Sequence, residues 1–491
     1  MASSHSRVPK AAEKRYHLWQ ALLRKAVGRV NSSVFREYDI RGLVDVDMNR
    51  DDVVRLGQAF GTYLREREVQ EALLGWDSRT SSPLYRDAMT EGLLATGIRV
   101  IDIGQVTTPI FYFARVHFDR EAGVMITASH NPAEYNGFKL AYGKSTIYGE
   151  DIQDVRRIME KGIFQEGRGS RTEANPVPAY LAMLKEKIRL GPRPVKVVVD
   201  CGNGTPSLFA EEVMNAFGVQ TIPLYCTSDP TFPNHHPDPV VAKNLQDLIK
   251  TVQEEKADLG VAFDGDGDRI GVVDDQGKII WGDRLMILYW REIAAKYPGT
   301  PAIVEVKCSK TLYDELEHLG AKPQFYKTGH SLIKAKMREL NAVFTGEMSG
   351  HMFFADEYYG YDDAFYAAGR LFRILSQTDQ PLSSLLHDVP NLPSTPEIRV
   401  DCPDDKKSLV VSTLQDYFKS NLDVNVIDID GLRVVFSFGW GLVRASNTQP
   451  ALVARAEADS EEHLKAITEK IDEAVGVFPF LDPIDWSGNS M

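Results

Sequence analysis

Ser129 carries a hydroxyl group in a sequence context that suits nucleophilic chemistry. It lies in TASHNP, residues 127–132, directly after the apolar run 123–126. A serine just past a strand end is accessible to a ligand, and Asn-Pro turns the chain immediately afterwards. His130 and Lys139 could supply the proton acceptor or positive charge that an unactivated hydroxyl needs, with a second turn at Asn136-Gly137 bringing the amine back. A capping serine in a polar loop is the simpler interpretation of a lone Ser-His pair.

A second stretch, DGDGDR, places Asp264, Asp266 and Asp268 at alternate positions with glycine between them and ends at Arg269. Glycine lets the backbone curl tightly, so the three carboxylates can face one cation. Crowded carboxylates repel unless a cation or Arg269 neutralises them, and oxygen ligands favour Mg²⁺ or Mn²⁺ over zinc. An EF-hand is excluded because Arg269 stands where its sixth position requires glycine. We expect a divalent metal site, with a plain acidic hairpin as the alternative.

A third stretch, GEMSGH at residues 346–351, carries a carboxylate, a hydroxyl and an imidazole. Glu347, Ser349 and His351 alternate, so an extended segment would project all three to one side. His330 lies upstream in TGHS, residues 328–331. Each of these groups can pair with a sugar hydroxyl, which indicates a polyhydroxylated ligand. A strand-end turn with a satisfied histidine is the alternative.

A fourth stretch, RASNTQP at residues 444–450, contains Arg444, Ser446, Asn447 and Thr448. A guanidinium with nearby hydroxyl, amide and backbone N–H donors suits a phosphate dianion. The alternative is a local turn beside an unrelated arginine. Lys307, at the end of the apolar run 302–306, could also reach an anion. A nucleophile, a metal site, a hydroxyl-binding site and a phosphate site together predict phosphoryl transfer on a sugar phosphate.

The elements that must position these loops are short β-rich runs alternating with helical stretches. The clearest examples are 72–75 followed by 84–96, 195–199 followed by 207–217, and 259–263 followed by 284–296 and 302–306. This alternation predicts an α/β fold with mixed or parallel sheets, in which binding loops follow the carboxyl ends of strands. A helix is also expected over 460–475.

Segments rich in glycine, proline or charge at 162–177, 274–278 and 388–396 divide the chain into modules. We predict an N-terminal extension at 1–33, a domain at 34–175 that carries the Ser129 loop and a metal-loop domain at 176–277. A sugar-loop domain at 278–391 and a phosphate-loop domain at 392–491 follow. Residues 1–33 carry seven basic residues and one acid, which fits a transit peptide or a surface-packed extension.

Composition excludes several classes of protein. The chain is 43% hydrophobic and 25% charged, as globular proteins are, and its net charge of −13 argues against non-specific nucleic-acid binding. No apolar run approaches the ~18 residues of a membrane span. Four cysteines without metal-site spacing predict reduced thiols and a cytoplasmic location. The expected partners are small molecules, with no nucleic acid or membrane, and the chain is a monomer or homodimer.

The four motifs in this order resemble the α-D-phosphohexomutase superfamily, and within it the bacterial phosphomannomutase/phosphoglucomutase group. The pieces that carry the resemblance are TASHNP with NGFK, then DGDGDR, GEMSGH and RASNTQP. The resemblance covers about residues 35–458. It implies four domains around a central cleft: three related α/β mixed-sheet modules and a C-terminal α+β domain of the TATA-box-binding-protein-like group. It also implies reversible transfer of a phosphoryl group between the 1- and 6-positions of mannose or glucose phosphates.

The resemblance further implies a role for each matching residue. Ser129 would be a phosphoserine, and with Asp264, Asp266 and Asp268 it would hold Mg²⁺; hexose 1,6-bisphosphate would be the intermediate and activator. The remaining implied roles are proton transfer by Lys139 and His330, charge stabilisation by His130, Arg41 and Arg269, sugar binding by Glu347, Ser349 and His351, and phosphate binding by Arg444, Ser446, Asn447, Thr448, Lys307 and Tyr38. Closure of the last module would need a hinge near 388–396.

Three alternatives stay open at this point. A phosphoglucosamine mutase of the same superfamily is the nearest, although Met348 and Asn447 fit the GEMSG and RxSNTxP forms of the mannose and glucose group. A metal-dependent sugar phosphatase would use Asp264 or Asp266 as its nucleophile and leave the Ser129 loop unexplained. A catalytically silent sugar-phosphate sensor is the third.

Overall fold

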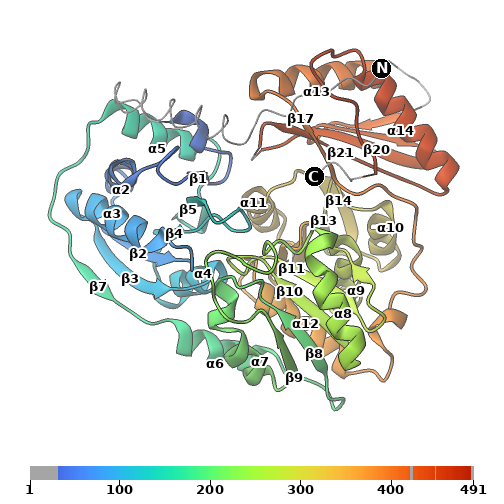
Figure 1. Cartoon of the computed structure of the whole chain (residues 1–491), viewed down its shortest axis with the longest axis horizontal. Helices are drawn as coiled ribbons and strands as arrows, with labels where there is room; N and C mark the ends of the chain where they lie inside the picture. Colours follow the sequence, from blue (N-terminus) through green and yellow to red (C-terminus); the bar gives the residue numbers. More distant parts are fainter. Residues whose placement is uncertain (1–30, 421–423, 448, 488–491) are drawn as a thin grey trace.

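The computed structural model describes residues 31–420, 424–447 and 449–487 and builds them into four units that follow one another along the chain. Figure 1 shows the first unit in blue to blue-green, the second in green, the third in yellow to orange and the fourth in orange-red to red. Most of the predicted extension, residues 1–30, lies outside the described residues. Within the described part, no helix is both long and apolar enough to cross a membrane.

The first unit is a seven-stranded sheet with helices on both faces. Its main strand order is β1-β5-β4-β2-β3-β7, with β6 paired to β5. Alternate residues of β2 point to opposite cores: Leu73 joins one hydrophobic cluster, whereas Ala72 and Leu74 join the other. The elements are η1 (Ser32–Val34), β1 (Ile40–Leu43), α2 (Arg50–Arg65), β2 (Glu71–Trp76), α3 (Ser82–Ala95), β3 (Arg99–Gln105), α4 (Thr108–His117), β4 (Gly123–Ile126), β5 (Tyr135–Tyr142), β6 (Ser145–Thr146), α5 (Glu150–Lys161) and β7 (Arg171–Glu173).

The second unit is a five-stranded sheet in the order β12-β11-β10-β8-β9. The expected helix over 207–217 is split, because Phe209 leaves helical geometry at φ −128° between η2 and α7. The expected boundary at 277/278 falls inside the hairpin formed by β11 and β12, which keeps both strands in this sheet. The elements are α6 (Val177–Lys187), β8 (Lys196–Asp200), η2 (Thr205–Leu208), α7 (Ala210–Phe217), β9 (Gln220–Leu224), η3 (Ala242–Leu245), α8 (Gln246–Glu255), β10 (Leu259–Phe263), β11 (Ile270–Asp274) and β12 (Ile279–Ile280).

The third unit contains two strand pairs, β13 with β14 in parallel and β15 with β16 in antiparallel orientation. It shares one continuous hydrophobic core with the second unit and with α4 of the first, so these three units are packed as one block. The elements are α9 (Gly282–Ala294), β13 (Pro301–Glu305), α10 (Lys310–His318), β14 (Lys322–Tyr326), α11 (His330–Leu340), β15 (Phe344–Gly346), β16 (Met352–Phe354), α12 (Ala364–Ser376) and η4 (Leu382–Ser384).

The fourth unit is an antiparallel sheet, β17-β21-β20-β19-β18, and its core is separate from the shared one. Its apolar link to the third unit is a small cluster of Val306, Trp440 and Leu442. Polar contacts add to this link, because Arg433 donates to the carbonyl groups of Val306 and Cys308. A separate core is what a unit that moves as a body requires. The elements are β17 (Ile398–Asp401), α13 (Asp404–Lys419), β18 (Asn425–Ile427), β19 (Leu432–Phe436), β20 (Gly439–Ala445), β21 (Ala451–Ala458) and α14 (Glu461–Val475).

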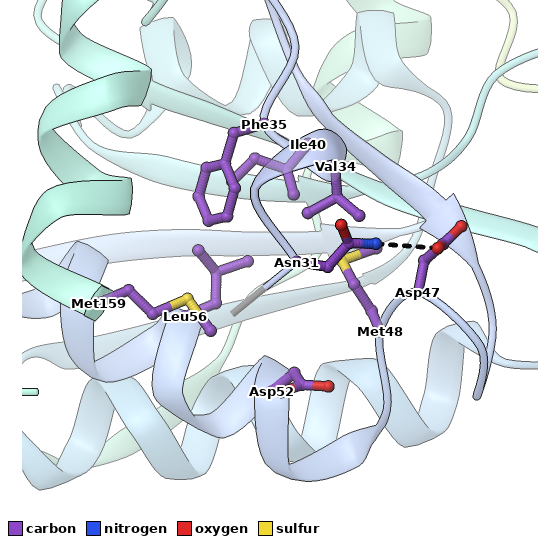
Figure 2. Close-up of a pocket in the computed structure, with 9 residues that line it drawn as sticks. All are labelled: Asn31, Val34, Phe35, Ile40, Asp47, Met48, Asp52, Leu56 and Met159. Carbon is purple, nitrogen blue, oxygen red and sulfur yellow. Dashed lines mark hydrogen bonds between the residues drawn. The ribbon is translucent and has the colours of Figure 1, made fainter. Parts of the chain in front are cut away.

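A small pocket lies where the described chain enters the first unit. Figure 2 shows it lined mainly by apolar side chains, with Asn31 donating a hydrogen bond of 2.9 Å to Asp47 at its edge. None of the residues predicted to carry chemistry lines this pocket. The candidate site lies elsewhere, where loops from all four units converge.

Candidate active site

Ser129 lies three residues beyond the end of β4, in a left-handed backbone conformation with φ +51°. Its Oγ donates a hydrogen bond of 2.8 Å to Oδ2 of Asp264 and lies 3.1 Å from Nδ1 of His130. The Ser129 hydroxyl of the first unit therefore contacts residues 264–269 of the second unit, which we call the acidic loop. Strained backbone geometry is typical of functional residues, and here both Ser129 and Asp264 are buried.

Lys139 reaches the same place along a different path from the one expected. Residues 136 and 137 form no turn, because they are part of β5, and Gly137 pairs with Arg41 of β1. A Cβ on Gly137 would lie 2.4 Å from the carbonyl oxygen of Ile40, so this close strand contact requires glycine. Pairing of β5 with β4 sets Lys139 opposite Met125. Met125 lies just before residues 127–132, which we call the serine loop.

Arg79 holds the serine loop from behind, and the sequence reasoning missed it. Its guanidinium donates to four backbone carbonyl groups, with distances of 2.8 Å to Ser129, 2.6 Å to Asn131, 2.6 Å to Pro132 and 3.0 Å to Tyr135. The guanidinium is buried, and the carboxylate of Asp77 lies 3.2 Å from its Nε. The available signal was position: GWDSR at 75–79 follows the carboxyl end of β2, the neighbour of β4.

The acidic loop links β10 to β11 and is fully buried at all three aspartates. Oδ1 of Asp264 accepts hydrogen bonds from the N–H groups of Gly267, Asp268 and Arg269 at 3.0–3.1 Å. These bonds curl the loop, and Gly267 takes a φ of +78°. A Cβ on Gly265 would lie 2.4 Å from the carbonyl oxygen of Ser129, so the two loops can meet only at glycine.

The residues of this loop fit a divalent cation. One carboxylate oxygen from each aspartate lies within 4.8 Å of the others, and Oδ1 of Asp266 and of Asp268 is buried without a hydrogen-bond donor. Buried acceptors that lack donors favour a cation. Nζ of Lys139 lies 2.8 Å from Asp266 and also contacts Asp268. Burial, together with repulsion from Asp266 and Asp268, raises the pKa of Asp264.

Glu347, Ser349 and His351 do not lie on an extended segment, and that expectation was wrong. Residues 347–350 form the turn of the β15–β16 hairpin, closed by a hydrogen bond of 2.8 Å from Glu347 N–H to the carbonyl of His351. Gly350, at φ +90°, makes this tight turn possible. Oε1 of Glu347 accepts a hydrogen bond of 2.7 Å from the N–H of Gly329, which ties the hairpin to the segment that precedes His330.

Two histidines stack beside the acidic loop. The rings of His330 and His351 are 5.5 Å apart, and Nε2 of His351 accepts a hydrogen bond of 3.0 Å from Arg269. Burial and the nearby Lys334 lower the pKa of His330, so its imidazole is neutral near pH 7. His330 is the first residue of α11.

Asp362 joins these groups and was also missed by the sequence reasoning. Its carboxylate lies 3.0 Å from Nδ1 of His351, 3.8 Å from Nδ1 of His330 and 2.8 Å from Nζ of Lys334. All of these side chains are buried. Asp362 follows an irregular segment after β16, and no local pattern distinguishes it from the acidic residues around it.

The fourth unit contributes Arg444 at the end of β20 and the loop that follows. Arg444 Nε donates a hydrogen bond of 2.9 Å to Asp430. This bond holds the guanidinium in a fixed position for binding an anion. Asn447 donates a hydrogen bond to the hydroxyl of Tyr38. That hydroxyl donates a hydrogen bond of 3.2 Å to the carbonyl of Thr328. Units one, three and four therefore meet at Tyr38. Thr448 lies outside the described residues.

Other predicted residues take defined places around this centre. Arg41 donates to the side chains of Asp39 and Asn131, which puts its guanidinium beside the serine loop. Burial and the charges of Arg269 and Arg41 lower the pKa of His130. Lys307 pairs with Glu397 at 2.8 Å, and Ser446 is buried close to Arg444 in the same loop.

Comparison with known proteins agrees with a fold of four domains. Models described as phosphoglucomutase/phosphomannomutase match four successive segments: alpha/beta/alpha domain I at 32–166, domain II at 178–277, domain III at 281–392 and the C-terminal domain at 397–474. The predicted α/β fold of three related modules and a distinct C-terminal domain is confirmed.

Relatives cover nearly the whole chain. A phosphomannomutase/phosphoglucomutase of Pseudomonas aeruginosa is 43% identical over 89% of this chain and 94% of its own length. A phosphoglucomutase of Neisseria gonorrhoeae is 39% identical over 92% and 98%. The crystal structure of a phosphoglucomutase/phosphomannomutase family protein from Burkholderia thailandensis superimposes with a TM-score of 0.86 at 37% identity, covering 93% of this chain and 100% of that one. With this identity over almost their full length, the chain belongs to the phosphoglucomutase/phosphomannomutase family of the α-D-phosphohexomutase superfamily.

Proposed function

We propose that this enzyme reversibly transfers a phosphoryl group between the 1- and 6-positions of mannose or glucose phosphates. Ser129 would carry the phosphoryl group, and a hexose 1,6-bisphosphate would be the intermediate and activator. The observation that carries the proposal is the hydrogen bond of 2.8 Å between Ser129 and Asp264, which joins the nucleophile to the acidic loop. Phosphoryl transfer depends mainly on such positioning and on charge neutralisation.

The acidic loop would hold Mg²⁺ through Asp264, Asp266 and Asp268, together with the phosphate on Ser129. Bound there, the ion would neutralise charge on the transferring group. Two further features of the chain itself serve the same end. The guanidinium of Arg269 donates to His351 and that of Arg41 to Asn131 beside Ser129, while Lys139 contacts two carboxylates of the acidic loop. His130 lies 3.1 Å from the serine oxygen and would help to stabilise charge there.

Proton transfer to and from the sugar hydroxyl would involve Lys139 and His330. A neutral imidazole suits the accepting role, and burial with Lys334 nearby keeps His330 neutral. His330 also lies within 3.8 Å of the carboxylate of Asp362, which can stabilise the imidazolium that forms. The lysine and the histidine come from different units, so they could serve the two chemical steps from different sides.

The sugar and its second phosphate would be held by the other two loops. Glu347, Ser349 and His351 would bind hydroxyl groups, and the phosphate-binding set would be Arg444, Ser446, Asn447, Thr448, Lys307 and Tyr38. One site must accept the bisphosphate in two opposite orientations, so the phosphate that does not react is the shared handle. Its binding energy can be used to align the reacting end.

Turnover of mannose 1-phosphate and glucose 1-phosphate with trace bisphosphate tests the proposal. Ser129→Ala should abolish it, whereas Ser412→Ala, at an exposed serine of α13, should leave it unchanged. Intact-mass analysis should find one phosphate on the Ser129 peptide in part of the sample. Release of inorganic phosphate with Ser129→Ala still active would favour a phosphatase. Preference for glucosamine 1-phosphate would favour the phosphoglucosamine branch.

The proposal includes the setting of the reaction. Small-molecule hexose phosphates would be the only required partners, with no nucleic acid or membrane, and the chain would act as a monomer or homodimer. A cytoplasmic location agrees with four cysteines that form no disulfide.

A further inference from the structure

Two cysteines of the second unit lie with their sulfur atoms in contact. Cys201 follows β8, Cys226 follows β9, and their Sγ atoms are 3.1 Å apart. The N–H of Cys201 donates a hydrogen bond of 3.1 Å to the carbonyl of Leu224, so the ends of the two parallel strands are already joined by a backbone hydrogen bond. A disulfide bond has an S–S length of about 2.05 Å, so the sulfurs need to approach by only about 1 Å.

We propose that Cys201 and Cys226 form a reversible intrachain disulfide when the protein meets a hydroperoxide. This modification site is separate from the phosphoryl-transfer reaction and does not depend on it. Cys226 also contacts the carbonyl groups of Val199 and Leu224, but it alone with Cys201 has a second thiol as partner; the sulfur of Cys308 pairs with Glu305, and that of Cys402 with the carbonyl of Pro403. Those thiols are therefore internal controls.

The chemistry divides naturally between the two thiols. Cys226 is half-buried and Cys201 is fully buried, so the peroxide reaches Cys226 first. A hydrogen bond from Cys201 lowers the pKa of the Cys226 thiol, whereas burial raises the pKa of Cys201. The thiolate is the reactive form, which assigns attack to Cys226 and resolution to Cys201.

The electron and atom balance is complete with one hydrogen peroxide. The Cys226 thiolate attacks one peroxide oxygen, the O–O bond breaks, and the released hydroxide takes the thiol proton to leave water and a sulfenic acid. The sulfur of Cys201 then attacks the sulfenic sulfur, the S–O bond breaks, and the departing hydroxide takes the proton of Cys201 as a second water. Two thiols lose two electrons and two protons in total, and the peroxide is reduced.

The disulfide would tie together two segments that support the acidic loop. The N–H of Thr205, four residues after Cys201, donates a hydrogen bond of 2.9 Å to the carbonyl of Gly265 in the acidic loop. Pro237, in the segment that begins at Cys226, lies against Gly202, where an added Cβ would be 3.0 Å away. We therefore expect oxidation to slow local opening of both segments.

Peptide mapping of the full-length protein decides the matter. Reduced protein is treated with stoichiometric hydrogen peroxide, blocked with an alkylating agent in denaturant and digested without reductant. We expect a linked pair of peptides containing Cys201 and Cys226, lighter than their sum by two hydrogens and separated by dithiothreitol, with Cys308 and Cys402 alkylated. Amide exchange over 201–205 and 226–241 should be slower in the oxidised protein.

Variants sharpen the test. Cys226→Ser and Cys201→Ser should remove the linked pair, and Cys402→Ser should leave it unchanged. Sulfenic or sulfinic acid accumulating on Cys226 beside a free Cys201 would overturn the proposal, as would oxidation of Cys402 or Cys308 before this pair. The map of the unaltered protein gives the answer even where a serine variant does not fold. Because no step uses substrate, failure here leaves the phosphoryl-transfer proposal untouched, and the reverse also holds.

Discussion

Nζ of Lys139 lies 2.8 Å from Oδ2 of Asp266, so a protein cation occupies the edge of the loop that we propose binds Mg²⁺. The ammonium also contacts Asp268. Lys139 therefore has two tasks that oppose each other: it neutralises the carboxylates, and it competes with a metal ion for them.

Replacing Lys139 by methionine should separate these tasks. We expect Lys139→Met to bind Mn²⁺ or Mg²⁺ at least tenfold more tightly while losing most of its turnover, because a unit charge at about 4 Å is worth several kcal/mol at an effective dielectric constant of about 20. Titration calorimetry on dephosphorylated protein measures the affinity. Lys187→Met, at a lysine that donates to the carbonyl of Glu357, should change neither quantity. Equal affinities of variant and unaltered protein would contradict the competition.

Removing the metal should remove activity reversibly. Treatment with a chelator should abolish turnover, and added Mg²⁺ should restore it, because Asp266 and Asp268 each keep a buried oxygen without a donor. Asp266→Asn should require at least about tenfold more Mg²⁺ for half-maximal rate, since an amide is a weaker ligand than a carboxylate. The exposed Asp314→Asn serves as the control. Full activity in the presence of chelator would exclude a metal requirement.

Substituting Arg79 should loosen the serine loop. Arg79→Lys keeps the charge but cannot serve four carbonyl groups, so we expect a loss of about 1–3 kcal/mol in the free energy of unfolding for a buried acceptor left unpaired. Phosphorylation of Ser129 and turnover should fall with it. Arg115→Lys is the matched control, because Arg115 is a buried arginine that donates to carbonyl groups of Glu121 and Gly143 away from Ser129. A similar loss of phosphorylation in both variants would mean that Arg79 acts only through stability.

The contact between Tyr38 and Asn447 should hold the fourth unit near the first. Tyr38→Phe removes the hydroxyl that joins them, so we expect a larger radius of gyration in small-angle scattering without ligand. Hexose bisphosphate should reverse the change by bridging Arg444 and the other loops, with the motion centred near 388–396.

Tyr63→Phe provides the comparison for this measurement, because the Tyr63 hydroxyl donates to Asp151 within the first unit. It should leave the scattering unchanged. Identical dimensions for all proteins with and without bisphosphate would argue against closure of the fourth unit.

His235 should make stability depend on pH. Its Nε2 lies 3.0 Å from buried Asp200; burial alone would lower the pKa of His235, but the hydrogen bond and charge of Asp200 raise it above 6.5. The stabilisation is therefore complete below the unfolded-state pKa of about 6.5 and is lost as pH rises through the higher folded-state pKa. Urea unfolding should show a larger cost of His235→Gln at pH 6 than at pH 9. A cost independent of pH would refute this ion pair.

The candidate site could be predicted from short motifs because each motif is local. DGDGDR carries its own geometry: the glycines permit the curl that brings three N–H groups onto Asp264. TASHNP follows the end of β4, and RASNTQP begins with the last two residues of β20, so both lie where the chain leaves a strand. The alternation of apolar runs and helical stretches predicted the α/β class for the same reason, since period and strand length are local properties.

Only the tertiary structure decided which loops meet and what holds them. Arg79 and Asp362 act on residues 50 and 11 positions or more away in the chain, and no spacing rule links them to Ser129 or His351. The turn at 347–350 and the strand at 136–137 depended on pairing between β15 and β16 and between β5 and β1, which the alternation of polar residues cannot reveal. Side-chain types determined what this site can do; the packing of four units against one another determined where the charges come together.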